Sequence, residues 1–267
     1  MRYLPTVWPR KNIGEHEYTL RVRPRFYVPE VDERADRVDV PDEEAEHLVR
    51  VLRLGVGDEV DVFDGRGGMW RAAIVHANKK TAAVRPLERV EAARELEVHV
   101  TLVMSVLKGD KMDDVVRDAV MLGVAAIHPV VSERAETSMA ALARSSRIAR
   151  WERIAVSSAK QCGRAVVPTV HHATPIDWYW NEKTDATRLL CVEPSATLGE
   201  VRAVGQIMRP KAAHLIVGPE GGWSVTEVAA AHDSGAILMS LGSRTLRADA
   251  VPIVALAALL TTWGELS

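Results

Sequence analysis

The pattern of apolar and polar positions changes character near residue 95. Before that point, short strand-like runs alternate with glycine turns, as in RFYV, DEVDVFDG, MWRAAIVHA and TAAVRPLERV. One helix interrupts them over about residues 43–53, where Leu48, Val51 and Leu52 recur at helical spacing. Because short strands separated by glycine turns are typical of small barrels, we expect a β-barrel domain over residues 25–95.

From residue 97 onwards, predicted strands alternate with predicted helices. VHVTLVMSVL and AAIHPVV are predicted strands, and the helix between them ends at Gly123. A long helix is predicted over about residues 139–160, further strands at RLLCVE, HLIVG and AILMSLG, and a last helix over about 250–263. Alternating units of this kind form a parallel sheet covered on both faces, so we expect an α/β domain over residues 96–267.

A glycine-rich junction, LIVGPEGGWSVTEV, joins one predicted strand directly to a helix. Its SVTE segment, Ser224 to Glu227, fits a capping box, which predicts that the helix begins at once after the loop. In open parallel sheets, ligands bind at such carboxyl ends of strands. Gly218, Gly221 and Gly222 would let the backbone approach a ligand closely or adopt a positive φ.

The motifs of the common phosphate ligands are absent from this junction. There is no GxxxxGK[ST] motif, and no GxGxxG motif opens the first strand–helix unit, which disfavours a nucleotide phosphate or a dinucleotide. Two further strand ends matter: LMSLGSRTLRAD turns at Gly242 and carries Arg247, and LLCVEPSAT leaves its strand through Glu193 and Pro194. Three strand ends could therefore line one pocket.

Composition limits the class of protein. Among the 267 residues, 47% are hydrophobic and 26% charged, and the net charge of -2 excludes an overall basic nucleic-acid binder, so RNA binding would need a local basic patch.

Cys162 and Cys191 lack the spacing of a zinc site or disulfide framework, and the histidines at 171 and 172 lack companion ligands, so we expect no bound metal ion. No apolar run is long enough for a membrane span, and the start lacks the apolar core of a signal peptide. We expect a cytoplasmic protein with a basic extension over residues 1–24.

These segments together resemble a known class of enzyme. LIVGPEGGWSVTE, followed by LGSRTLRAD and an alanine-rich last helix, resembles the SPOUT class of S-adenosylmethionine-dependent RNA methyltransferases. Within it the chain is similar to the RsmE family, which methylates a uridine of small-subunit (16S) ribosomal RNA on the ring imide nitrogen, giving 3-methyluridine. RFYVP, HLVRVLRLGVGDEVDVFDGRGG, LKGDKMDDVV, LGVAAIHPVVSERAE and KQCGRAVVP extend the resemblance over residues 25–264.

The resemblance implies a fold and partners that periodicity does not. It implies that the carboxy-terminal parallel sheet carries a deep trefoil knot, through which the final helix threads, and that the amino-terminal barrel is PUA-like and assists RNA binding. It also implies a homodimer paired through the knotted domains, acting on small-subunit ribosomal RNA or on the assembled small subunit.

The resemblance assigns the pocket to S-adenosylmethionine. The residues it implies for cofactor binding come from three strand ends and act largely through their backbone: Pro194, Val217, Gly218, Gly222, Leu241, Gly242, Leu246 and Arg247.

Catalysis requires few protein groups, because the sulfonium group of S-adenosylmethionine is already an activated methyl donor. A uridine imide keeps most of its proton at neutral pH, so a base or an electrostatic aid should help its departure. Arg247 could stabilise negative charge on the flanking carbonyl oxygens, or it could be an ordinary ion pair or phosphate contact. Glu220 and Asp249 are candidate proton acceptors; alternatively, Asp249 caps the last helix and Glu220 organises its own loop.

Basic residues in family-like segments are candidates for RNA phosphate contacts. Arg50 and Arg53 lie three apart on the predicted barrel-domain helix and should share a face. The full set of candidates is Arg50, Arg53, Lys108, Lys111, Arg134 and Arg164.

The chain departs from the family pattern at two places. The family commonly has Glu-Thr-Ala where this chain has Asp249, Ala250 and Val251, and a glutamate where it has Met121. Asp249 keeps the charge with a shorter reach.

Two alternatives remain open. Related SPOUT enzymes that methylate ribose typically carry an SLN-type segment where this chain has TLR, which favours base methylation, although another RNA or position is an alternative. The other is a non-catalytic RNA-binding factor of ribosome assembly, against which the intact glycines argue.

Overall fold

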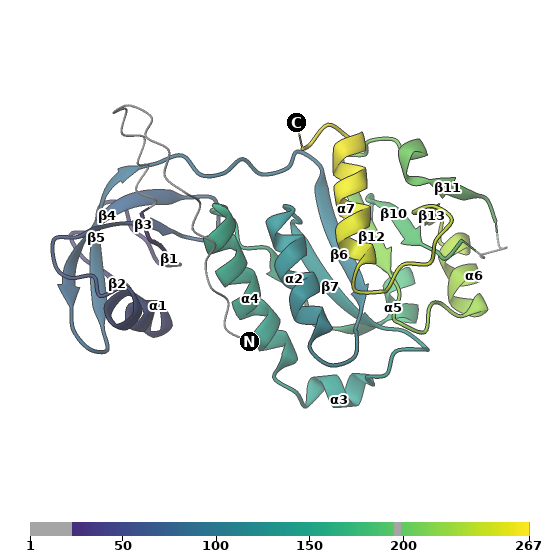
Figure 1. Cartoon of the computed structure of the whole chain (residues 1–267), viewed down its shortest axis with the longest axis horizontal. Coiled ribbons are helices and arrows are strands. Elements are labelled where there is room, and N and C mark those ends of the chain that lie inside the picture. The colour runs from purple at the N-terminus through teal and green to yellow at the C-terminus, as the bar shows by residue number, and fades with distance from the viewer. Residues whose placement is uncertain (1–22, 195–198, 267) are drawn as a thin grey trace, which may run out of the picture.

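The computed structural model describes residues 23–194 and 199–266, which form two lobes joined by a connector (Figure 1). Most of the basic extension predicted over residues 1–24 therefore lies outside the described residues. No helix in the described ranges is long and apolar enough to cross a membrane.

The amino-terminal lobe is built on a five-stranded sheet of order β1-β3-β4-β5-β2. β1 runs parallel to β3, whereas the other pairs are antiparallel. Phe26, Leu48, Val60 and Ile74 are fully or almost fully buried against this sheet, as the predicted barrel requires. The strands are β1 (Arg25–Tyr27), β2 (Val38–Val40), β3 (Glu59–Phe63), β4 (Met69–Ala77) and β5 (Ala82–Arg89).

The predicted helix of this lobe is shorter than expected. It consists of α1 (Asp42–Glu46) and one π-helical turn, η1 (His47–Val51). Arg53 lies beyond the helix with a φ of 55°, in the left-handed region. The expectation that Arg50 and Arg53 share a helical face is therefore wrong, because the chain has already reversed at Arg53.

The carboxy-terminal lobe contains the predicted parallel sheet. Its order is β11-β13-β10-β12-β6-β7-β8, β9 pairs with β7, and the strand pairs of this sheet are parallel throughout the described residues. Because β10, β12 and β13 are neighbours, their carboxyl ends meet at one edge. The strands are β6 (His99–Ser105), β7 (Ala126–Val131), β8 (Thr169–Val170), β9 (Thr174–Pro175), β10 (Thr187–Cys191), β11 (Val201–Ala203), β12 (Ala212–Val217) and β13 (Ile237–Ser240).

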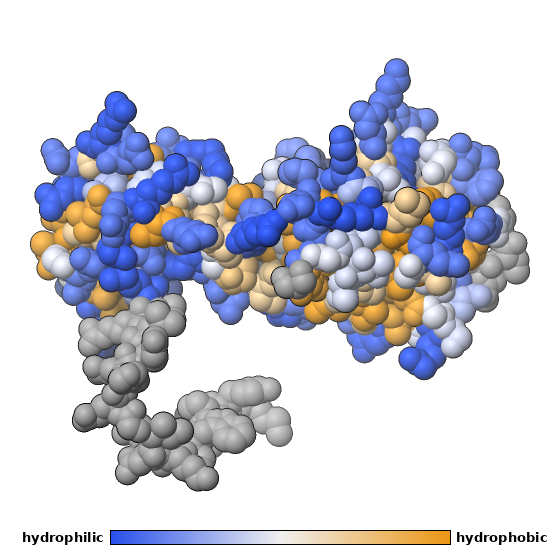
Figure 2. Space-filling view, turned by 90° about the horizontal axis from the view of Figure 1, so that it is seen from above, coloured by the Kyte–Doolittle hydropathy of each residue, from blue (hydrophilic) through white to orange (hydrophobic). Residues whose placement is uncertain are grey.

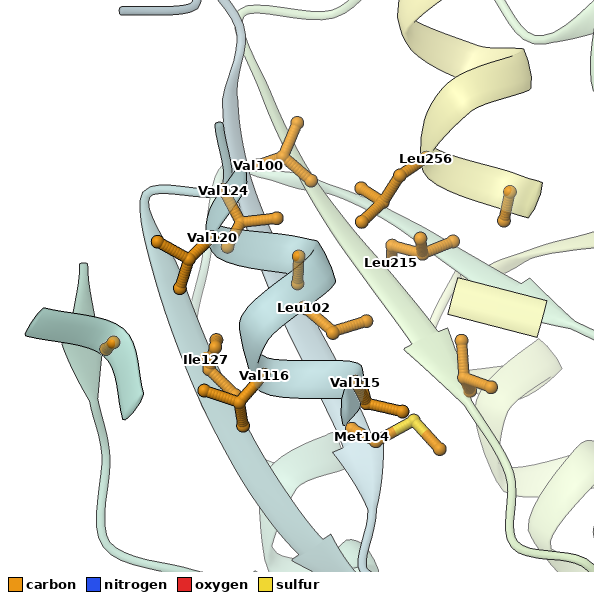
Figure 3. Close-up of a cluster of buried hydrophobic side chains, with 14 of the residues drawn as sticks. Val100, Leu102, Met104, Val115, Val116, Val120, Val124, Ile127, Leu215 and Leu256 are labelled. Atoms are coloured by element: carbon orange, nitrogen blue, oxygen red, sulfur yellow. The ribbon is translucent and has the colours of Figure 1, made fainter. Parts of the chain in front are cut away.

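Helices cover both faces of this sheet. Figure 3 shows one face, where Val116 of α2 lies close to Ile127 of β7, Val115 of α2 lies toward Met104 of β6, and Leu256 of α7 lies toward Leu215 of β12. A separate cluster packs α5 and α6 on the other face. The helices are α2 (Lys111–Met121), α3 (Met139–Ala143), α4 (Arg147–Cys162), α5 (Ile176–Trp180), α6 (Val225–Asp233) and α7 (Val251–Thr262).

The long helix predicted over 139–160 is two helices, α3 and α4. The break falls at Ser145 and Ser146, and the Ser145 hydroxyl donates to the Leu142 carbonyl at 2.8 Å. Serine side chains compete with helical hydrogen bonding in this way, so the interruption has a local cause.

Direct contacts join the two lobes beyond the connector. The Arg25 guanidinium of β1 donates to the carbonyls of Lys160 and Arg164, each at 2.8 Å, at the carboxyl end of α4. The Lys160 ammonium lies 2.8 Å from a Glu44 carboxylate oxygen, with both side chains less than 20% exposed. The backbone N–H of Val167 donates a hydrogen bond to the Gly65 carbonyl oxygen at 2.9 Å.

Arg164 occupies the centre of this junction. Its guanidinium pairs with Glu95 of the connector and donates to the carbonyls of Val120 and Val124, at the end of α2, at 2.8 and 3.1 Å. Only 4% of Arg164 is exposed. The predicted RNA contact at Arg164 is therefore wrong in this structure, because its donors are used inside the fold.

Replacing Arg164 with Met should lower the free energy of unfolding by about 2–4 kcal/mol, because buried carbonyls and Glu95 lose their partner. Urea denaturation measures the change, and exposed Arg144→Met is the control, expected within about 0.5 kcal/mol of wild type. Equal stability of the two variants would show that the junction does not depend on Arg164.

Candidate active site

The carboxyl ends of β10, β12 and β13 open into a cavity of about 500 Å³. The loops that follow these strands line it, together with the first turns of α6 and α7 and the first residue of α2. This volume falls in the range of about 300–1,000 Å³ that small-molecule sites occupy. The expectation that three strand ends share one pocket is confirmed.

Every residue predicted to hold the cofactor lies in the lining of this cavity. The strand ends bring them together from positions up to about fifty residues apart in the chain. They are Pro194, Val217, Gly218, Gly222, Leu241, Gly242, Leu246 and Arg247.

The glycine loop needs its glycines for conformation and for packing. Gly222 has a φ of +67°, and a Cβ there would lie 3.0 Å from a Glu193 carboxylate oxygen. A Cβ on Gly218 would lie 3.0 Å from the Trp223 ring, whose indole N–H donates to the Cys191 carbonyl at 3.0 Å. Trp223 thereby ties the loop to β10, a role the sequence analysis missed although the residue directly follows the glycines.

The predicted capping box at the start of α6 is confirmed. The Ser224 hydroxyl accepts from the Glu227 backbone N–H at 3.3 Å, and a Glu227 oxygen accepts from the Ser224 N–H at 2.8 Å. The second Glu227 oxygen accepts from the Glu133 backbone N–H at 2.7 Å. The loop after β7 is thus fastened to the glycine loop, a contact that no local pattern revealed.

Arg134 strengthens the same contact. Its guanidinium donates to the Gly221 carbonyl at 3.1 Å, and a Cβ on Gly221 would lie 3.0 Å from the Arg134 Cβ. Arg134, predicted as an RNA contact, therefore lies at the cavity wall, exposed to solvent on its outer side.

Glu220 is an ion-paired carboxylate. One of its oxygens lies 2.7 Å from the Lys111 ammonium and 3.3 Å from the Lys108 backbone N–H. Burial raises the pKa of Glu220, but hydrogen bonds from Lys111 and from the backbone N–H groups outweigh it and hold the pKa below its usual value. A carboxylate stabilised in this way is a weak proton acceptor.

Asp249 is likewise paired, with Arg247. The Arg247 Nε and Nη2 donate to its two oxygens at 3.0 and 3.1 Å, and these hydrogen bonds are the main reason that the Asp249 pKa is lowered. The N-cap of α7 is Ala250, without a side-chain cap, so the alternative that Asp249 caps this helix is wrong. Arg247 keeps 75% of its side chain exposed toward solvent and the cavity.

Apart from the buried Arg164, the predicted RNA-contact residues separate into two groups, one at the cavity and one on the barrel lobe. Lys111 and Arg134 line the cavity, and Lys108 pairs with Glu136 beside it. Arg50 lies on the barrel lobe, where it pairs with Glu46, and Arg53 follows it.

Among the residues that the structure describes, no cluster of histidine, cysteine and carboxylate side chains is arranged to hold a metal ion.

Comparison with known proteins defines the class. A family model described as "RNA methyltransferase domain" matches residues 94–260, and one described as "RNA methyltransferase PUA domain" matches residues 40–87. The fold and the cavity are thus those of an RNA methyltransferase with a PUA domain.

The relatives define the particular family. The chain is 36% identical to ribosomal RNA small subunit methyltransferase E of Synechocystis, over 79% of this chain and 68% of the relative. It is 27% identical to the Bacillus subtilis protein of that name, over 85% and 91%. This chain belongs to the ribosomal RNA small subunit methyltransferase E family, as the sequence resemblance predicted.

Solved structures agree with this assignment. The structure is similar to that of ribosomal RNA small subunit methyltransferase E from Neisseria gonorrhoeae bound to S-adenosyl methionine, with a TM-score of 0.80, 33% identity, and coverage of 90% of this chain and 98% of that one. A putative methyltransferase from Legionella pneumophila, in complex with the same cofactor, gives a TM-score of 0.83 at 26% identity over 90% and 98%. The predicted combination of SPOUT-type sheet and PUA-like barrel is confirmed, whereas the threading of α7 through a knot stays a prediction.

Proposed function

We propose that this chain transfers the methyl group of S-adenosylmethionine to the ring imide nitrogen of a uridine in small-subunit ribosomal RNA, giving 3-methyluridine. The observation that carries the proposal is the single cavity at the ends of β10, β12 and β13, where all the predicted cofactor residues meet. Membership of the family and two S-adenosylmethionine-bound neighbours support it.

The cavity suits S-adenosylmethionine in size and in chemistry. Gly222 and Gly242, both with positive φ, present bare backbone, and nothing lies within 4 Å of a Cβ built on Gly242. Leu241 and Leu246 supply apolar wall, and Glu193 supplies a carboxylate that complements a positively charged ligand.

The reaction forms an N–CH₃ bond, breaks the S–CH₃ bond with its electron pair left on sulfur, and releases the imide proton. Arg247 acts on the uridine: Asp249 occupies only part of the guanidinium's donor set. The remaining N–H groups are therefore able to donate to the ring oxygens on which negative charge develops. Asp249 orients this guanidinium. Because Glu220 and Asp249 are both ion-paired with lowered pKa values, neither carboxylate is favoured as the proton acceptor, and we assign that role to solvent.

The RNA backbone is bound by cations at the rim of the cavity and on the barrel lobe. Lys108 and Arg134 lie at its rim, and Arg50 and Arg53 offer a second contact on the barrel lobe. The proposed substrate is small-subunit ribosomal RNA, free or assembled, and the proposed location of the protein is accordingly the cytoplasm.

The product identifies the reaction. Purified protein, labelled S-adenosylmethionine and unmodified small subunits should give labelled 3-methyluridine after the RNA is digested. A parallel assay with protein-free ribosomal RNA shows whether the substrate is the free RNA or the assembled small subunit. If the label is found on ribose or on another base, the assignment as an RNA methyltransferase stands, but the assignment of the uridine imide nitrogen as the methylated atom is wrong. Absence of both transfer and cofactor binding would favour the non-catalytic assembly factor.

Replacing Arg247 with Ala should lower the single-turnover rate by about 10²–10³-fold, because an oxyanion-type donor is lost. S-adenosylmethionine affinity, measured by calorimetry, should be partly retained because the glycine loop is unchanged. Arg247→Lys is the control, because lysine keeps the positive charge but lacks the paired N–H donors of the planar guanidinium. Unchanged turnover in Arg247→Ala would remove this residue from the mechanism.

We further propose a homodimer through the carboxy-terminal lobe, where apolar positions, orange in Figure 2, form patches among hydrophilic surface. Ile253 and Val254 of α7 are 40% and 41% exposed. Replacing both with Glu should convert the dimer to a monomer in light scattering, whereas Leu87→Glu on the barrel lobe should not. A dimer that survives the double substitution would place the interface elsewhere.

A further inference from the structure

Lys111 occupies an unusual position for a lysine. It is the first residue of α2, where the partial positive charge of the helix terminus favours anions and disfavours cations. Its side chain is only 34% exposed and lines the cavity together with the glycine loop and Arg247. A half-buried cation at this end of a helix is unfavourable locally, so its place in the cavity calls for a functional reason.

The Lys111 ammonium pairs with one carboxylate of the cavity lining and acts electrostatically on a second. Its Nζ lies 2.7 Å from Glu220 of the glycine loop. Its charge also acts on Asp249, whose pKa is lowered chiefly by the hydrogen bond from Arg247 and to a smaller extent by Lys111. Glu220 also accepts from the Lys108 backbone N–H at 3.3 Å, which fixes the carboxylate that orients the ammonium.

We infer that Lys111 is a catalytic residue that binds the substrate base, donating a hydrogen bond to a ring carbonyl oxygen, and that Glu220 is its positioning residue. This inference rests on the proposed function. An ammonium has more N–H donors than Glu220 uses, so a donor remains for the base. As the imide proton leaves to solvent and the methyl group moves from sulfur to nitrogen, Lys111 stabilises the negative charge on the ring oxygen.

This role differs measurably from the phosphate contact predicted from the sequence. A phosphate contact would raise the KM for RNA, depend on salt, and show the same defect at every pH. A residue that stabilises the ionised imide is needed less as rising pH ionises the imide without help. The defect of a Lys111 variant should therefore shrink as the pH rises.

The experiment measures single-turnover methylation of small subunits by wild type, Lys111→Met, Lys111→Arg and Glu220→Gln, between about pH 6.5 and about pH 9.5. At neutral pH, Lys111→Met should lose about 10²–10³-fold in rate, and Lys111→Arg should recover most of it. The loss in Lys111→Met should fall by at least about tenfold at the alkaline end. Its S-adenosylmethionine affinity, measured by calorimetry, should stay close to that of wild type, which also shows that the cavity is folded.

Glu220→Gln separates positioning from proton transfer. A positioning role predicts a loss below about tenfold, whereas loss of a general base predicts about 10²–10⁴-fold and would overturn the assignment of Glu220. A pH-independent defect in Lys111→Met, or one confined to the KM for RNA, overturns the role of Lys111 alone. A wild-type protein that forms no 3-methyluridine in the same assay overturns the proposed function and this inference with it.

Discussion

The buried carboxylate of Glu227 holds the parts of the candidate site together. Only 4% of Glu227 is exposed, and its two oxygens accept backbone N–H groups from different segments, Ser224 at 2.8 Å and Glu133 at 2.7 Å. The first bond starts α6 directly after the glycine loop, and the second joins the loop after β7 to the same point. A buried donor left without its acceptor is costly, so this carboxylate fixes the relative position of three segments. The wall of the cavity depends on that constraint.

Paired charges determine which chemistry the cavity supports. Lys111 with Glu220, and Arg247 with Asp249, place each carboxylate beside a cation that holds it ionised. Carboxylates with lowered pKa values are poor at removing a proton, whereas the cations keep donors directed at the cavity. Such a site stabilises developing negative charge, which is what methyl transfer to an imide requires when the donor is already activated.

Local chemistry explains what could be predicted from the sequence. The capping box, the glycines and the alternation of apolar strands with helices each depend on residues a few positions apart, and the structure has them where expected. The errors depend on distant partners or on backbone reversal. Arg164 is buried because Glu95, 69 residues away, meets it, and Arg53 leaves the helix by a single left-handed φ. The knot, which stays a prediction from the resemblance, is a property of the whole chain path that no periodicity encodes.

Helix α4 connects the barrel lobe to the substrate side of the cavity. Its last carbonyls, which a helix cannot satisfy internally, accept from Arg25 of β1. At its other end, Arg147 donates to the carbonyls of Leu107 and Gly109, at 2.8 and 3.2 Å, in the loop that leads to Lys111. A helix of 16 residues spans about 24 Å as a stiff rod. In the proposed function it keeps an RNA bound on the barrel and a base bound at Lys111 at a fixed separation. The proposed role of the barrel is therefore to help position the base, in addition to binding the RNA.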